Sequence, residues 1–68
     1  MQRIPVISEA VRSIGYEGRT LEVEFDDRGV YQYFDVPEPV YAELMLSESI
    51  GRYVATRVRG RYRYLRVG

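Results

Sequence analysis

The chain has 68 residues, of which 46% are hydrophobic and 29% charged, a composition typical of a globular domain rather than a disordered segment. A chain this short buries only about 60% of the surface that its unfolded form exposes, which argues against a deep cofactor pocket. It contains no Cys, and it shows neither a secretory signal nor an apolar run long enough to span a membrane. We therefore expect one domain in the cytoplasm, stabilised by a hydrophobic core and holding no cofactor.

The net charge of zero conceals an uneven distribution of charge along the chain. Residues 1–48 hold all ten acidic residues and four of the ten arginines, a balance of −6, whereas residues 49–68 hold six arginines and no acid, a balance of +6. Genomic base composition could explain why every basic residue is Arg, but it does not explain why the arginines cluster. The C-terminal end is therefore the first place to search for an interaction.

Three segments of the N-terminal half have the pattern of β-strands. Residues 4–8 contain Pro5, so they predict only an edge strand or a lead-in. Residues 10–17 alternate loosely and end in a turn. Residues 20–26 alternate strictly between apolar and acidic side chains, which makes them the clearest strand in the chain. The apolar side chains of this strand are Leu21, Val23 and Phe25.

The next strand, at residues 30–36, is expected to return through a hairpin that ends at Gly29, since glycine accepts the positive φ of such turns. A bulge at Gly29 pairs Phe25 with Tyr31 and places both Tyr31 and Tyr33 on the core face. A four-residue loop shifts the pairing by one residue and turns both tyrosines to the acidic face. We favour the bulge, because a glycine at the end of the loop is what it requires.

After this strand the period of the apolar residues changes to that of a helix. Pro37 and Pro39 can begin a helix but cannot continue a strand, so we expect a short helix over residues 37–46. Ser49 is a suitable N-cap for a second helix, and Gly60 suits its end. The apolar stripe of this second helix is Ile50, Tyr53, Val54 and Val58.

Together these segments predict an α+β fold. It consists of a three-stranded antiparallel meander packed with two short helices, in a single domain over residues 1–68. Residues 60–68 are expected to be a basic tail or an extra extended segment.

The order of these segments resembles the KTSC domain, a small bacterial domain also found at the C-terminus of some lysyl-tRNA synthetases. The resemblance covers residues 7–62. It is carried by the ordered set VRSIGYE, LEVEF, the Tyr-x-Tyr of Tyr31 and Tyr33, VPEPVY and SIGRYVATRVRGRY. The chain departs from the family at Val54 and Ala55, where Phe-Asn is common, and in its Arg-rich end. Attachment to a synthetase makes RNA the ligand that the resemblance favours.

The strongest chemical pattern is the alternation of Arg with other residues near the C-terminus. In an extended segment, side chains two residues apart share a face, so the arginines would lie on one side and the tyrosines on the other. The second helix would remove Arg57 from such a ribbon, and Arg59 as well if the helix extends that far, which leaves Arg61 and Arg63 as its sure members. The candidate nucleic-acid-binding residues are Arg57, Arg59, Arg61, Tyr62, Arg63, Tyr64 and Arg66.

Two interpretations of this segment remain open. Arg neutralises phosphates and stacks on bases, and an exposed Tyr ring adds about 1 to 3 kcal/mol for each stacked base, which favours single-stranded nucleic acid. Alternatively, the tyrosines pack on the sheet and the arginines pair with Glu22, Glu24 and Asp35 of the same chain. Tyr31 and Tyr33 are further candidates for stacking, although alternating rings on a strand are more typical of a core.

The chain offers little for catalysis. It has no His, Cys or Lys that could act as a conventional base or nucleophile, and its acids lack the spacing of a metal-binding loop. We therefore expect neither an enzyme nor a metal protein.

The leading hypothesis for function is a small module that binds RNA or another single-stranded nucleic acid. The alternative is an adapter whose basic end and sheet edge bind an acidic protein or a second copy of the chain.

Overall fold

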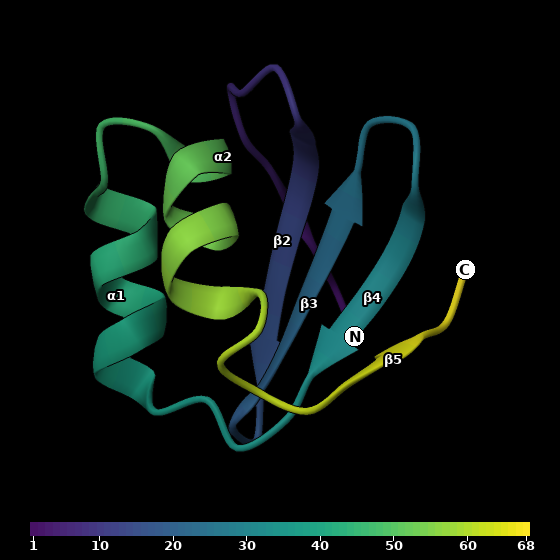
Figure 1. Ribbon diagram of the computed structural model, residues 1–68, viewed down its shortest axis with the longest axis vertical. Coiled ribbons are helices and arrows are strands. Elements are labelled where there is room, and N and C mark those ends of the chain that lie inside the picture. Colours follow the sequence, from purple (N-terminus) through teal and green to yellow (C-terminus); the bar gives the residue numbers. More distant parts are fainter.

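The predicted meander is part of a larger antiparallel sheet in the computed structural model, which describes all residues 1–68. Five strands follow one another across the sheet in chain order. Figure 1 shows two helices against one face of this sheet, close to β2 and β3, whereas β4 and β5 extend beyond them. The strands are β1 (Ile4–Pro5), β2 (Val11–Glu17), β3 (Thr20–Phe25), β4 (Gly29–Tyr33) and β5 (Tyr64–Arg66).

The α+β class is confirmed, but the prediction of three strands was too low by two. β1 lies in the segment that its proline marked as an edge or a lead-in. β5 lies in the basic segment at residues 60–68, for which the sequence predicts a tail or an extra extended segment. It pairs with β4 through Tyr33 opposite Tyr64 and Tyr31 opposite Arg66. Three residues are too few to show a period, so the pairing with β4 is what makes this segment a strand.

The helices are α1 (Glu38–Leu46) and α2 (Ile50–Tyr53), and α2 continues into a π-helical turn at Val54–Val58. The predicted N-cap is confirmed, because the side chain of Ser49 accepts a hydrogen bond from the Arg52 N–H at 3.2 Å. The π-helical turn closes with a hydrogen bond of 2.9 Å from the Arg59 N–H to the Val54 carbonyl. Gly60, with φ of 78°, then turns the chain away from the helix axis.

The hairpin between β3 and β4 differs in register from both predicted alternatives. Phe25 pairs with Gly29 and Val23 with Tyr31, which leaves a three-residue loop over residues 26–28. Gly29 has φ of 95° and ends this loop. The favoured register was wrong by two residues, but a shift of two keeps each side chain on its face. Tyr31 and Tyr33 therefore lie on the core face, as predicted.

The hydrophobic core lies between the helices and the half of the sheet that they cover. In α1 only Leu44 is fully buried, and in the π-helical turn Val54 and Val58 are buried. Tyr16 of β2 stacks on Tyr41 of α1 with ring centroids 4.7 Å apart. The complete core is Val11, Ile14, Leu21, Val23, Phe25, Tyr33, Val36, Leu44, Val54 and Val58.

The opposite face of the sheet holds a polar cluster around the buried carboxylate of Glu22. This side chain forms an ion pair with Arg3 and accepts a hydrogen bond of 2.8 Å from Gln32. The N-terminal segment can approach β2 closely because residue 15 is a glycine. A Cβ on Gly15 would lie 2.6 Å from the carbonyl oxygen of Gln2. The N-terminal segment thus supplies the positive charge that a buried carboxylate needs.

The polar cluster predicts a pH dependence of stability. Burial alone would raise the pKa of Glu22, but hydrogen bonds from Gln32 and Arg3 and the charge of Arg3 together lower this pKa below 4.5. A lowered pKa in the folded state stabilises the protein above the ordinary pKa, and this contribution disappears as the pH falls through the lowered value. We expect the free energy of unfolding in urea to fall between about pH 5 and about pH 3, and Glu22→Gln to make this fall shallower.

Glu48→Gln is the matched control, because Glu48 is exposed and forms no ion pair. Equal pH slopes for Glu22→Gln and the parent chain would contradict the assigned role of Glu22.

Candidate nucleic-acid interface

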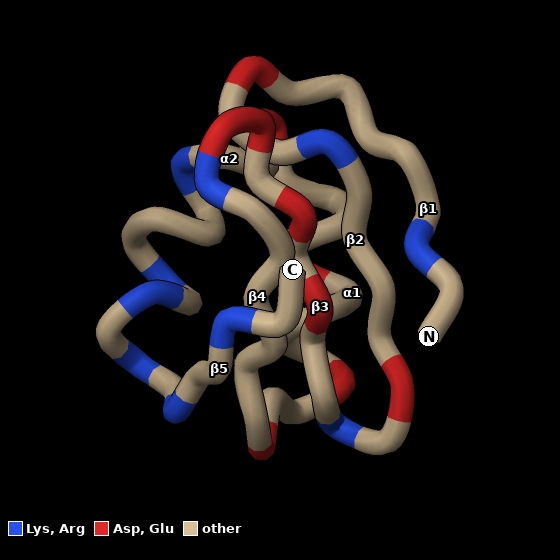
Figure 2. The backbone as a smooth tube through the Cα atoms, turned by 90° about the vertical axis from the view of Figure 1, so that its right-hand side faces the viewer, with Lys and Arg blue, Asp and Glu red and all other residues tan.

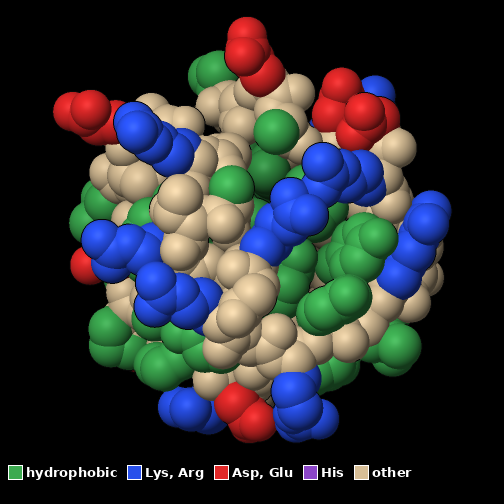
Figure 3. Space-filling model, viewed as in Figure 1, with side chains coloured by type: hydrophobic (Ala, Val, Ile, Leu, Met, Phe, Trp, Pro, Cys, Tyr) green, Lys and Arg blue, Asp and Glu red, His purple; other side chains and the backbone are tan.

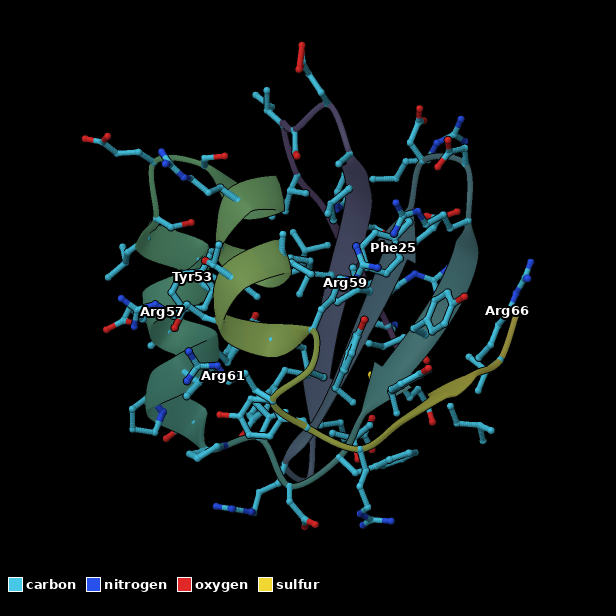
Figure 4. All side chains as sticks on the ribbon, viewed as in Figure 1. Phe25, Tyr53, Arg57, Arg59, Arg61 and Arg66 are labelled. Atoms are coloured by element: carbon cyan, nitrogen blue, oxygen red, sulfur yellow. The ribbon has the colours of Figure 1, made fainter.

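The C-terminal arginines do not form the extended ribbon that their alternation predicted. The π-helical turn ends at Val58, a turn follows over residues 59–61, and only Tyr64–Arg66 are extended. The prediction that Arg61 and Arg63 share one face of a strand is therefore wrong, because neither belongs to β5. Figure 4 shows Arg57 and Arg61 on the helical side, Arg59 over the sheet near Phe25, and Arg66 pointing outward from β5.

Most of this positive charge is not neutralised within the chain. Arg63 lies 3.2 Å from Asp35, and Arg57 lies 4.0 Å from Glu43; both pairs are exposed. Exposed pairs contribute little to stability. Of the acids that were expected to pair with the basic segment, Glu22 and Glu24 instead contact Arg3. No ion pair involves Arg59, Arg61 or Arg66.

An open groove of about 510 Å³ lies between the uncovered part of the sheet and the π-helical turn. We call it the aromatic groove. The aromatic side chains of the groove come from β3, β4 and β5 and point to the same face of the sheet. The opposite wall is formed by the π-helical turn and the residues that follow it. Figure 3 shows this region as exposed hydrophobic side chains with basic side chains on either side. Its lining is Phe25, Arg28, Tyr31, Tyr33, Ala55, Arg59, Gly60 and Tyr64.

The rings of the aromatic groove differ in exposure. Tyr33 is only 3% exposed and forms part of the core, so it has no free face for stacking. Tyr31 is half-buried and meets Phe25 edge-on, with centroids 5.7 Å apart. Tyr64 is 62% exposed, and its ring centroid lies 5.8 Å from that of Tyr31. Tyr62 packs against the core instead, which leaves Tyr64, flanked by Tyr31, as the ring accessible to a ligand.

Two guanidinium groups stand at the rim of the aromatic groove. They belong to Arg59, which follows the π-helical turn, and Arg28, in the loop between β3 and β4. Neither forms an ion pair with an acid. Burial raises the pKa of the Tyr33 hydroxyl, and the charges of Arg59 and Arg28 oppose this rise without reversing it.

The sequence did not identify Arg28 as a site residue, because it follows two aspartates and lies 29 positions before Arg57. Its only local signal is its place in a hairpin loop. The β3–β4 register brings this loop opposite the π-helical turn, and no periodicity along the chain reports that approach.

The helical side of the molecule holds Arg57 in a different setting. The Tyr53 hydroxyl donates a hydrogen bond of 2.7 Å to Glu43, which also lies near Arg57. Burial and this contact raise the pKa of Tyr53 to about 12. Tyr53 is therefore neutral at physiological pH and serves packing.

The helices of this structure are too short and too polar for any of them to span a membrane.

These features define a small α+β domain with an open aromatic groove between a sheet edge and a helix end. Comparison with known proteins identifies the family of this domain. The sequence profile of the KTSC domain matches residues 7–62, so the chain belongs to the KTSC domain family.

Similar proteins span the same length or contain the domain as a part. A KTSC domain protein from Yersinia pestis has a crystal structure that superposes with a TM-score of 0.96 at 38% identity, covering 98% of this chain and 97% of that one. An uncharacterised protein from Stutzerimonas stutzeri is 37% identical over 98% of this chain and 99% of its own length. A lysine–tRNA ligase from Trichormus variabilis is 38% identical over 79% of this chain, which is 10% of that enzyme.

Proposed function

We propose that this domain binds single-stranded nucleic acid, RNA in particular, through the aromatic groove. The observation that carries the proposal is the exposed ring of Tyr64 beside two guanidinium groups, those of Arg28 and Arg59, which have no acidic partner. Exposed aromatic rings stack on unpaired bases, and arginine binds phosphate. The role is that of a binding module in the cytoplasm, without catalysis.

The positive charge of the aromatic groove favours some of the ligand classes that bind to aromatic rings over others. Clusters of aromatic rings also bind quaternary ammonium groups, through cation–π attraction. Arg28 and Arg59 would repel such a cation, and no acid lines the aromatic groove to compensate. A flat ligand that carries negative charge is therefore favoured, and a nucleotide combines a planar base with a phosphate. The groove volume of about 510 Å³ is within the usual range of small-ligand sites.

The remaining basic residues of the predicted site extend the surface on either side of the groove. Arg61 lies toward the helical side and Arg66 toward the sheet edge, and neither forms an ion pair with an acid (Figure 4). A strand whose base occupies the groove would pass one of these guanidinium groups. Arg57 and Arg63 are weaker contributors, because each already contacts an acid.

The relatives support RNA as the ligand class that we propose. Two lysine–tRNA ligases, from Trichormus variabilis and Nostoc, contain a segment similar to most of this chain. Those enzymes act on an RNA, so a domain attached to them has RNA within reach. We extend this ligand class to the present chain.

Fluorescence anisotropy with a labelled single-stranded RNA, measured over a series of salt concentrations, tests the proposal. We expect the logarithm of the association constant to fall with the logarithm of the salt concentration by about 0.7 for each neutralised phosphate. Arg59→Gln should weaken binding and reduce this slope by about one contact.

Arg52→Gln is the control for Arg59→Gln, because it removes the same charge at an exposed position outside the groove. Equal effects of the two variants would contradict the assignment of the groove, and no binding at low salt would contradict the function.

A protein partner is the second candidate, favoured by the free edge of the sheet at β5, where Leu65 is 57% exposed. An added strand would pair with this edge through main-chain hydrogen bonds. Such binding would leave Arg59→Gln without effect, would depend little on salt, and would be abolished by Arg66→Pro. The Arg66 N–H points to the free edge, because Arg63, Leu65 and Val67 are the residues that bond to β4.

A further inference from the structure

We propose that the aromatic groove binds the end of a strand, with a terminal phosphate held between Arg28 and Arg59 and the terminal base on Tyr64. This inference rests on the proposed nucleic-acid function and specifies the part of the ligand that the site recognises. Three features of the structure support it: the position of the two arginines, the acids beyond them, and the absence of acids in the groove.

Arg28 and Arg59 stand where two hollows of the surface meet. Both residues line the aromatic groove, and both also line a second hollow of about 330 Å³, as do Phe25 and Ala55. Figure 4 shows Arg59 directed over the sheet beside Phe25. A terminal phosphomonoester carries nearly two negative charges at neutral pH, whereas an internal phosphodiester carries one. Two unpaired guanidinium groups therefore match the terminal group better, by charge and by their capacity for bidentate hydrogen bonds.

The second hollow is unfavourable for the continuation of a strand. Its walls carry three carboxylates, those of Glu9, Asp26 and Asp27. Asp26 is paired with Arg12 at 3.0 Å, but Glu9 and Asp27 form no ion pair. Figure 2 shows acidic residues next to a basic residue in the β3–β4 hairpin. A phosphodiester that passed between the arginines would meet these carboxylates, and like charges at short range repel.

The aromatic groove itself is open to a strand from the other direction. Four of its lining residues are aromatic, two are arginine, and none is acidic. Tyr64 lies in β5 next to Leu65 and Arg66. Arg66 forms no ion pair with an acidic side chain, although its Nε donates a hydrogen bond of 3.0 Å to the oxygen of Gly68. Arg28 and Arg59 thus stand between a hollow with three carboxylates and a groove with none, so one terminal nucleotide fills the groove while the rest of the strand leaves past β5.

Three RNA oligonucleotides of one sequence test this inference: one with a 5′-phosphate, one with a 3′-phosphate, and one with hydroxyl groups at both ends. We expect one phosphorylated form to bind at least about tenfold more tightly than the hydroxyl form, as a charge-assisted contact implies. The form that binds identifies the strand polarity. Arg28→Gln should remove the preference, and the exposed Arg52→Gln should retain it.

The outcomes separate the two proposals. Equal affinity of all three oligonucleotides, with Arg59→Gln still weakening each of them, would overturn end recognition and leave the nucleic-acid function in place. No binding of any oligonucleotide would overturn both. A terminal preference that survives Arg28→Gln would also overturn the inference.

A second pair of substitutions tests the acidic boundary separately. Asp27→Asn combined with Glu9→Gln removes two exposed, unpaired carboxylates and leaves the groove lining unchanged. We expect this variant to bind the hydroxyl-ended RNA more tightly and so to reduce the preference for the phosphorylated form. An unchanged preference would overturn the role of these acids, and circular dichroism would verify that each variant is folded.

Discussion

Replacing Leu44 by alanine is expected to lower the free energy of unfolding by about 2 to 5 kcal/mol, the cost of removing a fully buried leucine side chain. Leu44 has no exposed surface, and it is the only residue of α1 that is fully buried. The cavity would open between α1 and the sheet. A domain of this size has a small total stability, so we expect a large unfolded fraction at room temperature.

Leu46→Ala is the matched control within the same helix. Leu46 is 86% exposed, so the same change of side chain should alter the free energy of unfolding by less than about 0.5 kcal/mol. Urea denaturation followed by circular dichroism measures both values. Similar losses for the two variants would show that α1 does not pack on the core through Leu44.

Replacing Tyr64 by alanine is expected to weaken RNA binding by about 5- to 150-fold, the loss of one stacked base. The ring of Tyr64 is 62% exposed and lies 6.0 Å from that of Tyr33, so it offers a platform at the mouth of the aromatic groove. Tyr64→Phe keeps the ring and should retain most of the affinity. Anisotropy titration at constant salt gives the comparison, with thermal unfolding as a test of the fold.

The two Tyr64 variants separate stacking from other roles of this residue. If Tyr64→Phe were as weak as Tyr64→Ala, the hydroxyl group rather than the ring would carry the contact. If neither variant changed the affinity, the base would not lie on Tyr64, and the groove would lose its main support as the binding site.

The partial covering of the sheet explains why this fold leaves a groove at all. α1 and α2 cover the side of β2 and β3, where Ile14, Leu21 and Val23 have no exposed surface. β4 and β5 continue the same face beyond the helices (Figure 1). On this part of the sheet Tyr33, in β4, is therefore buried, whereas Tyr64, in the edge strand β5, is exposed.

The local pattern of the chain was sufficient for the elements with a clear period or cap. Alternation predicted β3, the serine at position 49 predicted the start of α2, and the paired prolines predicted α1 to within one residue. The face of Tyr31 and Tyr33 followed as well, because the period of two survives an error of two in the register. The concentration of positive charge at the C-terminal end could also be seen directly in the sequence.

The site, in contrast, depends on contacts between distant segments. β5 is a strand because β4 offers hydrogen bonds to it, and the π-helical turn with Gly60 directs Arg59 away from the other arginines. Arg28 reaches the same groove through a hairpin whose register local patterns did not resolve. Periodicity reports which face of an element a residue occupies, but not which elements meet. The positive charge of the C-terminal end could therefore be seen in the sequence. Its division among the helical side, the aromatic groove and the sheet edge was decided by the packing of the elements.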